Sequence, residues 1–438
     1  MKEASNRISS TPGVVVSDAH PETYNVKYDA LILDAKLRQS LVTVRSLGRR
    51  GKRVAALEVT NLLESSRHVP TFSSRWCQKA YIAPAYEQSA ETFLSYLGQI
   101  LAQAGARVLI PSSDGMLALL REQRELIEQQ GTRIAIAKES ALAIAINKEQ
   151  TLEVAEKLGL GVPKGVMVTA VSEVGEAIRE IGLPAVVKPT ASWVWGETQG
   201  IRVVCQLVTT PDEARRAVEA LTQHGGAVLF QQFLAGRNES VSLFYARGEL
   251  YARFGQWSRR THPPLGGVST YRQSIEVPYD TGDQALRLVR EIELEGYSQV
   301  QFRRDKDGKP YLMEINPRLT SGIEIAVRSG VDFPYLMYQW ASGEHMERVE
   351  GYQVGGRMRY LEGDLLTTLR TFVEGGRPGV TPAPQALFEF VKDFFVPSGY
   401  DYMDREDPGP AWTAAQEFAD HLGYWWSGRQ AKRKVVSK

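Results

Sequence analysis

The stretch Met313-Glu314-Ile315-Asn316-Pro317-Arg318 closes a predicted β-hairpin. The two strands of this hairpin are expected at Gln299–Arg303 and Pro310–Ile315, on either side of the turn Asp305-Lys306-Asp307-Gly308. We expect this hairpin to position the functional groups of the chain.

Three polar residues of the hairpin are expected to share one face. Glu314 and Asn316 lie two residues apart on one strand, and Gln301 lies on the other strand. Oxygen ligands suit Mg²⁺, which typically takes one or two carboxylates, keeps some water and bridges to phosphates. The set predicts a site for Mg²⁺, with Glu314 shared between two ions. The alternative is a hairpin whose polar residues simply face solvent.

Arg318 follows Asn316 by two residues and precedes the small-residue turn Leu319-Thr320-Ser321-Gly322. A guanidinium at this position can hold a substrate carboxylate or stabilise charge that develops on a phosphate. These neighbours favour a functional site over a solvated hairpin.

The composition indicates a globular protein of two or three domains. The chain has 438 residues, and its 52 basic and 51 acidic residues leave a net charge of +1, which gives no overall field for binding nucleic acid or an anionic membrane. Only Cys77 and Cys205 are present, so neither a disulfide framework nor a zinc ribbon is expected. No signal peptide or membrane span is evident, and we expect a cytoplasmic protein.

The first half of the chain alternates short apolar runs with amphipathic segments. Strands are expected at Ala30–Leu33, Arg53–Val59 and Val108–Pro111, with helices near residues 39–50 and 90–104. This pattern predicts an open parallel sheet flanked by helices. Asp114 follows the third of these strands, where such sheets place their ligands, although it can equally be a helix cap.

Other nucleotide and metal motifs are absent from the sequence. It contains no G-x-x-x-x-G-K-[ST] phosphate loop, no G-x-G-x-x-G after a strand and no H-E-x-x-H pair. The hairpin is therefore the leading functional signal.

The hairpin segment resembles the metal-binding segment of ATP-grasp enzymes, especially the carbamoyl-phosphate-synthetase-like and D-aspartate-ligase-like carboxylate-amine ligases. The order of motifs extends from about Ala30 to Trp340. The resemblance implies an α/β chain with an open α/β (pre-ATP-grasp) domain, a two-subdomain α+β ATP-grasp fold and a C-terminal extension. The expected parts are a disordered lead-in at 1–25, the α/β domain at 26–140, a small subdomain at 141–226, a metal-binding subdomain at 227–350, and an extension with a basic tail at 351–438.

The resemblance also implies two lysines that reach the nucleotide phosphates. Lys148 opens a predicted helix, and Lys188 ends a predicted buried strand, where its ammonium must find an anion or water. Thr190–Gly200 matches the flap that folds over the phosphates in the family, although it carries Trp193 and Trp195. A strand connector with packed aromatic residues is the alternative for this loop.

An adenine-binding hinge is implied at Gln231, Gln232, Phe233 and Leu234, whose backbone groups would bond the adenine edge. Glu239 would then bond the ribose hydroxyls. On its own, Glu239 is equally compatible with an ordinary acidic residue at a strand edge.

A further cluster, Arg259–Ser269, resembles the loop that meets the acyl substrate. Surface arginines usually bind nothing specific, so this assignment rests on position alone. The substrate-binding candidates are Asp114, Arg260, His262, Ser269 and Arg272.

The resemblance implies an ATP-dependent ligase that converts a substrate carboxylate to an acyl phosphate and couples it to an amine. Lys188 and Arg318 would stabilise the transferring phosphoryl group. The cofactors would be ATP and two Mg²⁺ ions, with Mn²⁺ as an alternative, and family members commonly form homodimers. Two alternatives stay open: a carboxylase or carbamoyl-phosphate enzyme that uses bicarbonate, and an ATP-binding regulator without turnover.

Overall fold

The computed structural model describes residues 28–60, 68–190, 193–195, 200–202, 205–223, 226–264 and 267–420. The expected lead-in, the basic tail, residues 191–192 and 196–199 of the expected flap, and residues 265–266 lie outside the described residues. None of the helices in the described ranges has an apolar stretch long enough to span a lipid bilayer.

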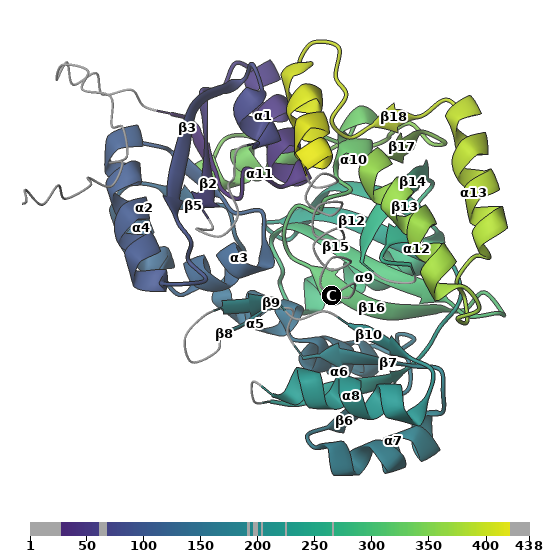
Figure 1. The fold of residues 1–438 in the computed structure, drawn as a ribbon. Helices are drawn as coiled ribbons and strands as arrows, with labels where there is room; N and C mark the ends of the chain where they lie inside the picture. The colour runs from purple at the N-terminus through teal and green to yellow at the C-terminus, as the bar shows by residue number, and fades with distance from the viewer. Residues whose placement is uncertain are drawn as a thin grey trace, which may run out of the picture.

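The N-terminal domain is a parallel five-stranded sheet in the order β3-β2-β1-β4-β5 (Figure 1). Its strands are β1 (Ala30–Ile32), β2 (Val54–Thr60), β3 (Cys77–Pro84), β4 (Val108–Ile110) and β5 (Arg133–Ile134). Its helices are α1 (Arg38–Arg49), α2 (Ala90–Ala104), α3 (Asp114–Arg121) and α4 (Arg124–Gln129), with the 3₁₀ helix η1 (Pro70–Ser73) before β3. The expected open α/β domain is confirmed. The strand order reverses between β1 and β4, and open α/β sheets typically bind ligands at the carboxyl ends of strands at such a reversal.

The second unit is a small antiparallel sheet in the order β10-β7-β11-β6. Helices α5 (Glu139–Ile146) and α6 (Lys148–Lys157) lead into it. Its elements are β6 (Gly165–Val168), η2 (Val171–Glu173), α7 (Val174–Ile181), β7 (Ala185–Pro189), β10 (Gln206–Val208), α8 (Pro211–Thr222) and β11 (Val228–Gln232), beside the hairpin β8 (Trp193–Trp195) and β9 (Gly200–Arg202). Because β11 pairs with β6 and β7, this unit extends to Gln232 and does not stop at the expected residue 226.

The third unit is a seven-stranded sheet in the order β16-β15-β12-β13-β14-β17-β18. Its strands are β12 (Asn238–Ala246), β13 (Glu249–His262), β14 (Val268–Ile275), β15 (Gly296–Arg304), β16 (Pro310–Asn316), β17 (Arg357–Arg359) and β18 (Gly399–Tyr400). Helices α9 (Tyr279–Glu291), α10 (Glu324–Arg328) and α11 (Phe333–Ser342) accompany it. The expected hairpin is the antiparallel pair β15 and β16.

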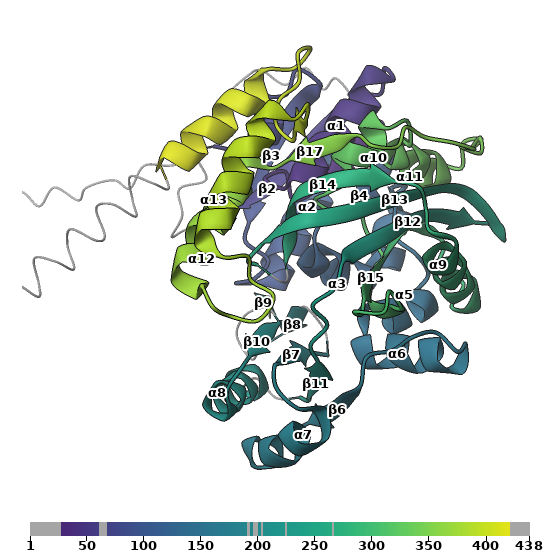
Figure 2. The same ribbon diagram turned by 90° about the vertical axis from the view of Figure 1, so that its right-hand side faces the viewer.

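The C-terminal region is part of this sheet and is not a separate extension from residue 351. Strand β17 pairs with β14, and β18 pairs with β17. Helices α12 (Leu361–Glu374) and α13 (Ala383–Lys392) follow β17, with η3 (Asp393–Phe395) after them, and α12 lies against β13 and β14 (Figure 2). The hydrophobic pattern after residue 351 is interrupted by loops, so the sequence did not reveal that these short strands complete a distant sheet.

The chain after β18 returns to the N-terminal domain and packs on α1. Arg45 of α1, which is 1% exposed, forms a 2.9 Å ion pair with Asp407. Arg38, also on α1, pairs with the buried Asp401. These buried charges join the two ends of the described chain.

Candidate functional site

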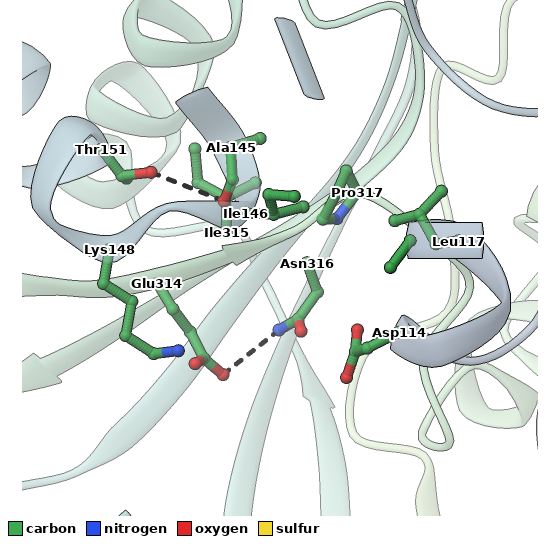
Figure 3. Close-up of a pocket in the computed structure, with 11 residues that line it drawn as sticks. Asp114, Leu117, Ala145, Ile146, Lys148, Thr151, Glu314, Ile315, Asn316 and Pro317 are labelled. Carbon is green, nitrogen blue, oxygen red and sulfur yellow. Dashed lines mark hydrogen bonds between the residues drawn. The ribbon is translucent and has the colours of Figure 1, made fainter. Parts of the chain in front are cut away.

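A cavity of about 820 Å³ lies where the three units meet. This volume is typical of a site for a small molecule or cofactor. The expected site residues that line it are Asp114, Lys188, Gln231, Gln232, Phe233, Leu234, Ser269, Gln301, Glu314, Asn316 and Arg318. Lys148 lines a small adjoining cavity together with Asp114, Glu314 and Asn316 (Figure 3). Residues far apart in the sequence therefore share one region.

The proposed metal-binding residues face one another across β15 and β16. Gln301 is the register partner of Glu314, and Gln299 is the register partner of Asn316. Asn316 Nδ2 donates to Glu314 Oε1 at 3.4 Å, and Gln301 Nε2 donates to Gln299 Oε1 at 3.4 Å. Sequence reasoning missed Gln299, although its position two residues before Gln301 on the same strand face was a usable signal.

The chemistry of these donors fits Mg²⁺ bound together with a phosphate. The described residues contain no group of three or more His, Cys, Asp or Glu side chains that could hold an ion by themselves. One carboxylate and three amides leave room for water and for phosphate oxygens, which Mg²⁺ accepts readily. An ion here therefore requires a second, oxygen-rich ligand.

Lys148 and Lys188 approach Glu314 from two different elements. Asn147 caps α6 by accepting hydrogen bonds from the backbone N–H groups of Glu149 and Gln150, at 3.0 and 3.1 Å. This cap fixes the first turn of α6, and the buried Lys148 side chain points toward Glu314 in Figure 3.

Lys188 lies on β7 and lines the main cavity. Burial lowers the pKa of Lys188, while the nearby Cys205 and Glu314 oppose that change and Lys148 adds to it. Two lysines close enough to affect each other form a cationic region beside Glu314, which suits a polyanion.

The expected hinge lines the cavity beside a cation that sequence reasoning missed. Arg303 Nη1 donates to the carbonyl oxygen of Leu234 at 3.1 Å, and burial lowers the pKa of Arg303. Gln231 is buried, and its Nε2 has no hydrogen-bond partner within the described ranges. An unpartnered buried donor is costly, so Gln231 is suited to donate to a ligand in the cavity.

Glu239 lies elsewhere. Its neighbours Asn238 and Ser240 line the cavity, whereas Glu239 points to the opposite face of β12, as strand alternation requires. Its carboxylate accepts hydrogen bonds from Arg304 Nη2 and Nε at 2.7 and 3.1 Å. The structure therefore does not support the expected ribose contact of Glu239, and instead assigns this residue a buried ion pair.

Arg318 is held by Asp114 from the N-terminal domain. Its Nε and Nη2 atoms lie 2.5 and 2.8 Å from Asp114 Oδ1 and Oδ2. Ser113 caps α3 by accepting a hydrogen bond from the backbone N–H of Met116 at 3.0 Å. The cap expected at this turn is therefore Ser113, and the side chain of Asp114 faces the cavity.

A buried carboxylate supports this turn from the carboxyl end of β1. Asp34 accepts hydrogen bonds from the backbone N–H of Ser112 and from Ser113 Oγ, at 3.0 and 2.9 Å. Burial raises the pKa of Asp34 to about 6. Asp34 therefore holds the turn that presents Asp114 to Arg318.

Two expected substrate arginines have structural partners instead. Arg260 forms ion pairs with Asp364 and Asp393, each at 2.6 Å. Arg272 is fully buried, pairs with Asp401 and donates to the carbonyl oxygen of Gly322 at 3.1 Å. Neither residue is among those that line the cavity, and acidic residues from the C-terminal region pair with both.

The remaining two substrate candidates differ in position. Ser269 lines the cavity, and its Oγ has no partner in the part of the chain that the structure describes. His262 is not among the lining residues, and its Nδ1 lies 3.3 Å from Thr367 Oγ1. Burial lowers the pKa of His262, as does the nearby Arg370. His262 therefore remains a less favourable candidate than Ser269.

The chain shares features with several known proteins. Residues 226–363 match the family model described as ATP-grasp in the biosynthetic pathway with Ter operon. The chain is 29% identical to the carbamoyl phosphate synthase large chain of Thermus thermophilus over 257 residues, which cover 54% of this chain and 24% of the relative. It is 28% identical to a D-alanine–D-alanine ligase of Gloeobacter violaceus over 225 residues, covering 45% of this chain and 68% of the ligase.

A solved structure shares the fold. The biotin carboxylase domain of the 2-oxoglutarate carboxylase of Hydrogenobacter thermophilus, solved with MgADP and bicarbonate, matches with a TM-score of 0.59 and 16% identity over 76% of this chain and 73% of that domain. The aligned part of this chain spans about a quarter of the carbamoyl phosphate synthase chain. Residues 226–363 therefore resemble an ATP-grasp segment, and the chain shares its fold with the biotin carboxylase domain.

Proposed function

We propose that this protein is an ATP-dependent ligase that joins a carboxylic acid to an amine, with ADP and phosphate as the other products. The observation that carries the proposal is the convergence of Lys148, Lys188, Arg318 and the carboxylate of Glu314 on one cavity region. A site that only stores ATP has little need for a fixed guanidinium beside the phosphate-binding groups.

The proposed reaction begins with attack of a substrate carboxylate oxygen on the terminal phosphorus of ATP. The bond from that phosphorus to the bridging oxygen breaks, ADP leaves and an acyl phosphate forms. The amine then attacks the acyl carbon, loses one proton, and phosphate leaves as the amide forms. No protein nucleophile is required, so catalysis consists of positioning and charge stabilisation.

The residues divide these tasks by position. The ammonium groups of Lys148 and Lys188 bind the triphosphate of ATP, and the hinge at Gln231–Leu234 binds its adenine ring. Gln299, Gln301, Glu314 and Asn316 would hold Mg²⁺, which neutralises phosphate charge when bound. Arg318, kept in place by Asp114, would stabilise the transferring phosphoryl group and the acyl phosphate.

The first experiment measures phosphate release from ATP and Mg²⁺ with pools of acids and amines. We expect at least one acid and amine pair to raise the rate above the ATP-only background. If no pair does so although ATP binds, the ligase proposal is wrong. Stimulation by bicarbonate alone would favour the carboxylase alternative.

A variant pair tests the role of Glu314. Glu314→Gln removes the carboxylate and should reduce turnover by about 100-fold or more, the usual loss when a group that stabilises transition-state charge is removed. Glu291→Gln is the matched control, because Glu291 is exposed on α9 outside the cavity. Equal activity of the two variants would contradict the assignment of Glu314.

A further inference from the structure

The far end of the cavity is lined by charged residues that neither the sequence nor the family resemblance identified. Arg216 and Glu213 come from α8, Arg370 and Glu374 come from α12, and Arg377 follows α12. The lower end of α12 lies above α8 in Figure 2, and Arg377 Nη2 donates to Glu213 Oε1 at 2.6 Å. The C-terminal region thus meets the small subdomain at this end of the cavity.

The proposed metal-binding residues on β15 and β16 lie at the other end of the cavity from these charged residues. Strands succeed one another across the floor in the order β16, β15, β12 and β13, so Glu314 is about 14 Å from β13 at the usual spacing of strands. The floor between them carries neutral polar side chains from Ser240, Gln256 and Ser258. Helix α12 is anchored beside β13 by Thr367 Oγ1, which donates to the carbonyl oxygen of Thr261 at 3.1 Å.

The charges at this end do not balance. Arg370 pairs with Glu374, and Arg377 pairs with Glu213, each at 2.6 Å. The side chain of Arg216 makes no hydrogen bond or ion pair with any other residue that the structure describes. At this end of the cavity, three described arginines therefore face two described glutamates, which leaves one net positive charge there.

The two ion pairs are open to exchange with a ligand. Arg370 and Arg377 are 46% and 34% exposed, and ion pairs that solvent reaches in this way contribute less stability than fully buried ones. Each guanidinium has five N–H donors, most of which are not used by its glutamate partner. Glu213 is fixed independently of Arg377, because it accepts hydrogen bonds from the backbone N–H and from Oγ1 of Thr209 at 2.8 and 2.9 Å.

We propose that Arg216, Arg370 and Arg377 bind an anionic group, a carboxylate or a phosphate ester, that a substrate carries away from its reacting atoms. The proposal rests on the ligase function proposed above and adds the substrate class: one of the two substrates has a second anionic group. All three arginines lie outside residues 226–363, so the proposed anion-binding site is not part of the segment that matches the ATP-grasp family model.

The test measures direct binding to the full-length protein in the presence of Mg²⁺ and a non-hydrolysable ATP analogue. The ligands are dicarboxylates, amino acids and phosphorylated amines, each compared with its neutral amide or its dephosphorylated form. We expect at least one anionic ligand to bind about tenfold or more tightly than its neutral match. The carboxylate and phosphate arms distinguish the two sources of negative charge.

Substitutions locate the binding site. Arg370→Gln and Arg377→Gln should each weaken binding of the preferred anion by about 10- to 100-fold, and the corresponding lysine variants should retain part of it. Arg215→Gln is the matched control on α8, because Arg215 is 55% exposed, pairs with Asp212 and does not line the cavity. Thermal unfolding and affinity for the ATP analogue report whether each variant is folded.

The outcomes separate this inference from the ligase proposal. If anion binding depends on Arg370 and Arg377 but phosphate release is not stimulated, the proposed anion-binding site is supported. The same result contradicts the ligase function. The anion-binding proposal is wrong if phosphate release is stimulated but anionic ligands are not preferred. It is also wrong if the preference is unaffected by both glutamine variants. Either result leaves the ligase function intact. If no anionic ligand binds, the anion-binding proposal is also wrong.

Discussion

Asp114 and Arg318 form a two-point ion pair that joins the N-terminal domain to the large sheet, with nitrogen–oxygen distances of 2.5 and 2.8 Å. Their positions are separated by 204 residues. The carboxylate of Asp114 binds one edge of the guanidinium through two in-plane hydrogen bonds, which restricts the rotation of the Arg318 side chain. Through Asp114, the N-terminal domain therefore helps to position a side chain of the proposed phosphoryl-transfer site.

Asp114→Asn should lower kcat by about 10- to 100-fold while the KM for ATP stays within about twofold, because the amide holds Arg318 less firmly. Steady-state kinetics on an active substrate pair measures this separation. Asp212→Asn is the control, since Asp212 is exposed and pairs with Arg215 away from the cavity. An equal rise in the KM for ATP would instead assign Asp114 to nucleotide binding.

Lys188→Met should weaken ATP binding by about 10- to 100-fold, because the ammonium that faces the triphosphate is lost. Calorimetry with ATP and Mg²⁺ measures the change. Lys157→Met is a control, since Lys157 is an exposed residue near the end of α6. Unchanged affinity would contradict the phosphate-binding role of Lys188.

The lowered pKa of Lys188 predicts a pH dependence of ATP binding. A bound triphosphate favours the charged ammonium and therefore raises the pKa of Lys188. At pH values where Lys188 is partly deprotonated in the free protein, ATP binding should be accompanied by proton uptake. Affinity should then fall as the pH rises through the alkaline range, below the usual lysine pKa. Calorimetry in two buffers of different ionisation enthalpy measures the uptake, which Lys188→Met should abolish.

Glu58 predicts a pH dependence of stability. Burial, aided by Asp34, raises the pKa of Glu58 from 4.5 to about 7. The folded protein therefore holds this proton more tightly than the unfolded chain, so the contribution of Glu58 to stability is present below about pH 4.5 and is lost as the pH rises to about 7. The loss is about 3 kcal/mol when the shift is converted to free energy.

Glu58→Gln should flatten this part of the stability profile. Chemical unfolding between pH 4.5 and pH 8 measures the slope. The absolute stability of the variant should also fall, because Glu58 accepts hydrogen bonds from the backbone N–H groups of Lys36 and Val59 and an amide cannot accept at both atoms. Retention of the wild-type slope would show that Glu58 does not titrate in this range.

Arg45→Met should destabilise the fold by about 3–5 kcal/mol, because Asp407 would keep its buried charge without its cation. Equilibrium unfolding in denaturant measures the loss. Asp407→Asn in the same chain should recover part of it by removing the unpaired charge. Arg53→Met is the control, since Arg53 is 49% exposed and lies 3.7 Å from Asp29, and it should cost less than about 1 kcal/mol.

The local patterns of the sequence predicted the elements that carry the site. The two-residue spacing of Glu314 and Asn316 predicted their shared strand face, and their position beside Gln301 agrees with the register of β15 and β16. The alternation of apolar runs with amphipathic segments predicted the parallel N-terminal sheet. These features depend on backbone periodicity and on turns, which neighbouring residues specify.

The tertiary structure alone decided which charged residues face the cavity. Arg260 and Arg272 looked like substrate-binding residues, but Asp364, Asp393 and Asp401 neutralise them from the C-terminal region. Arg370 and Arg377 carried no signal in the sequence and yet line the cavity. An arginine is free to bind a ligand only when folding leaves it without a buried carboxylate partner, and residues more than 100 positions away determine that outcome.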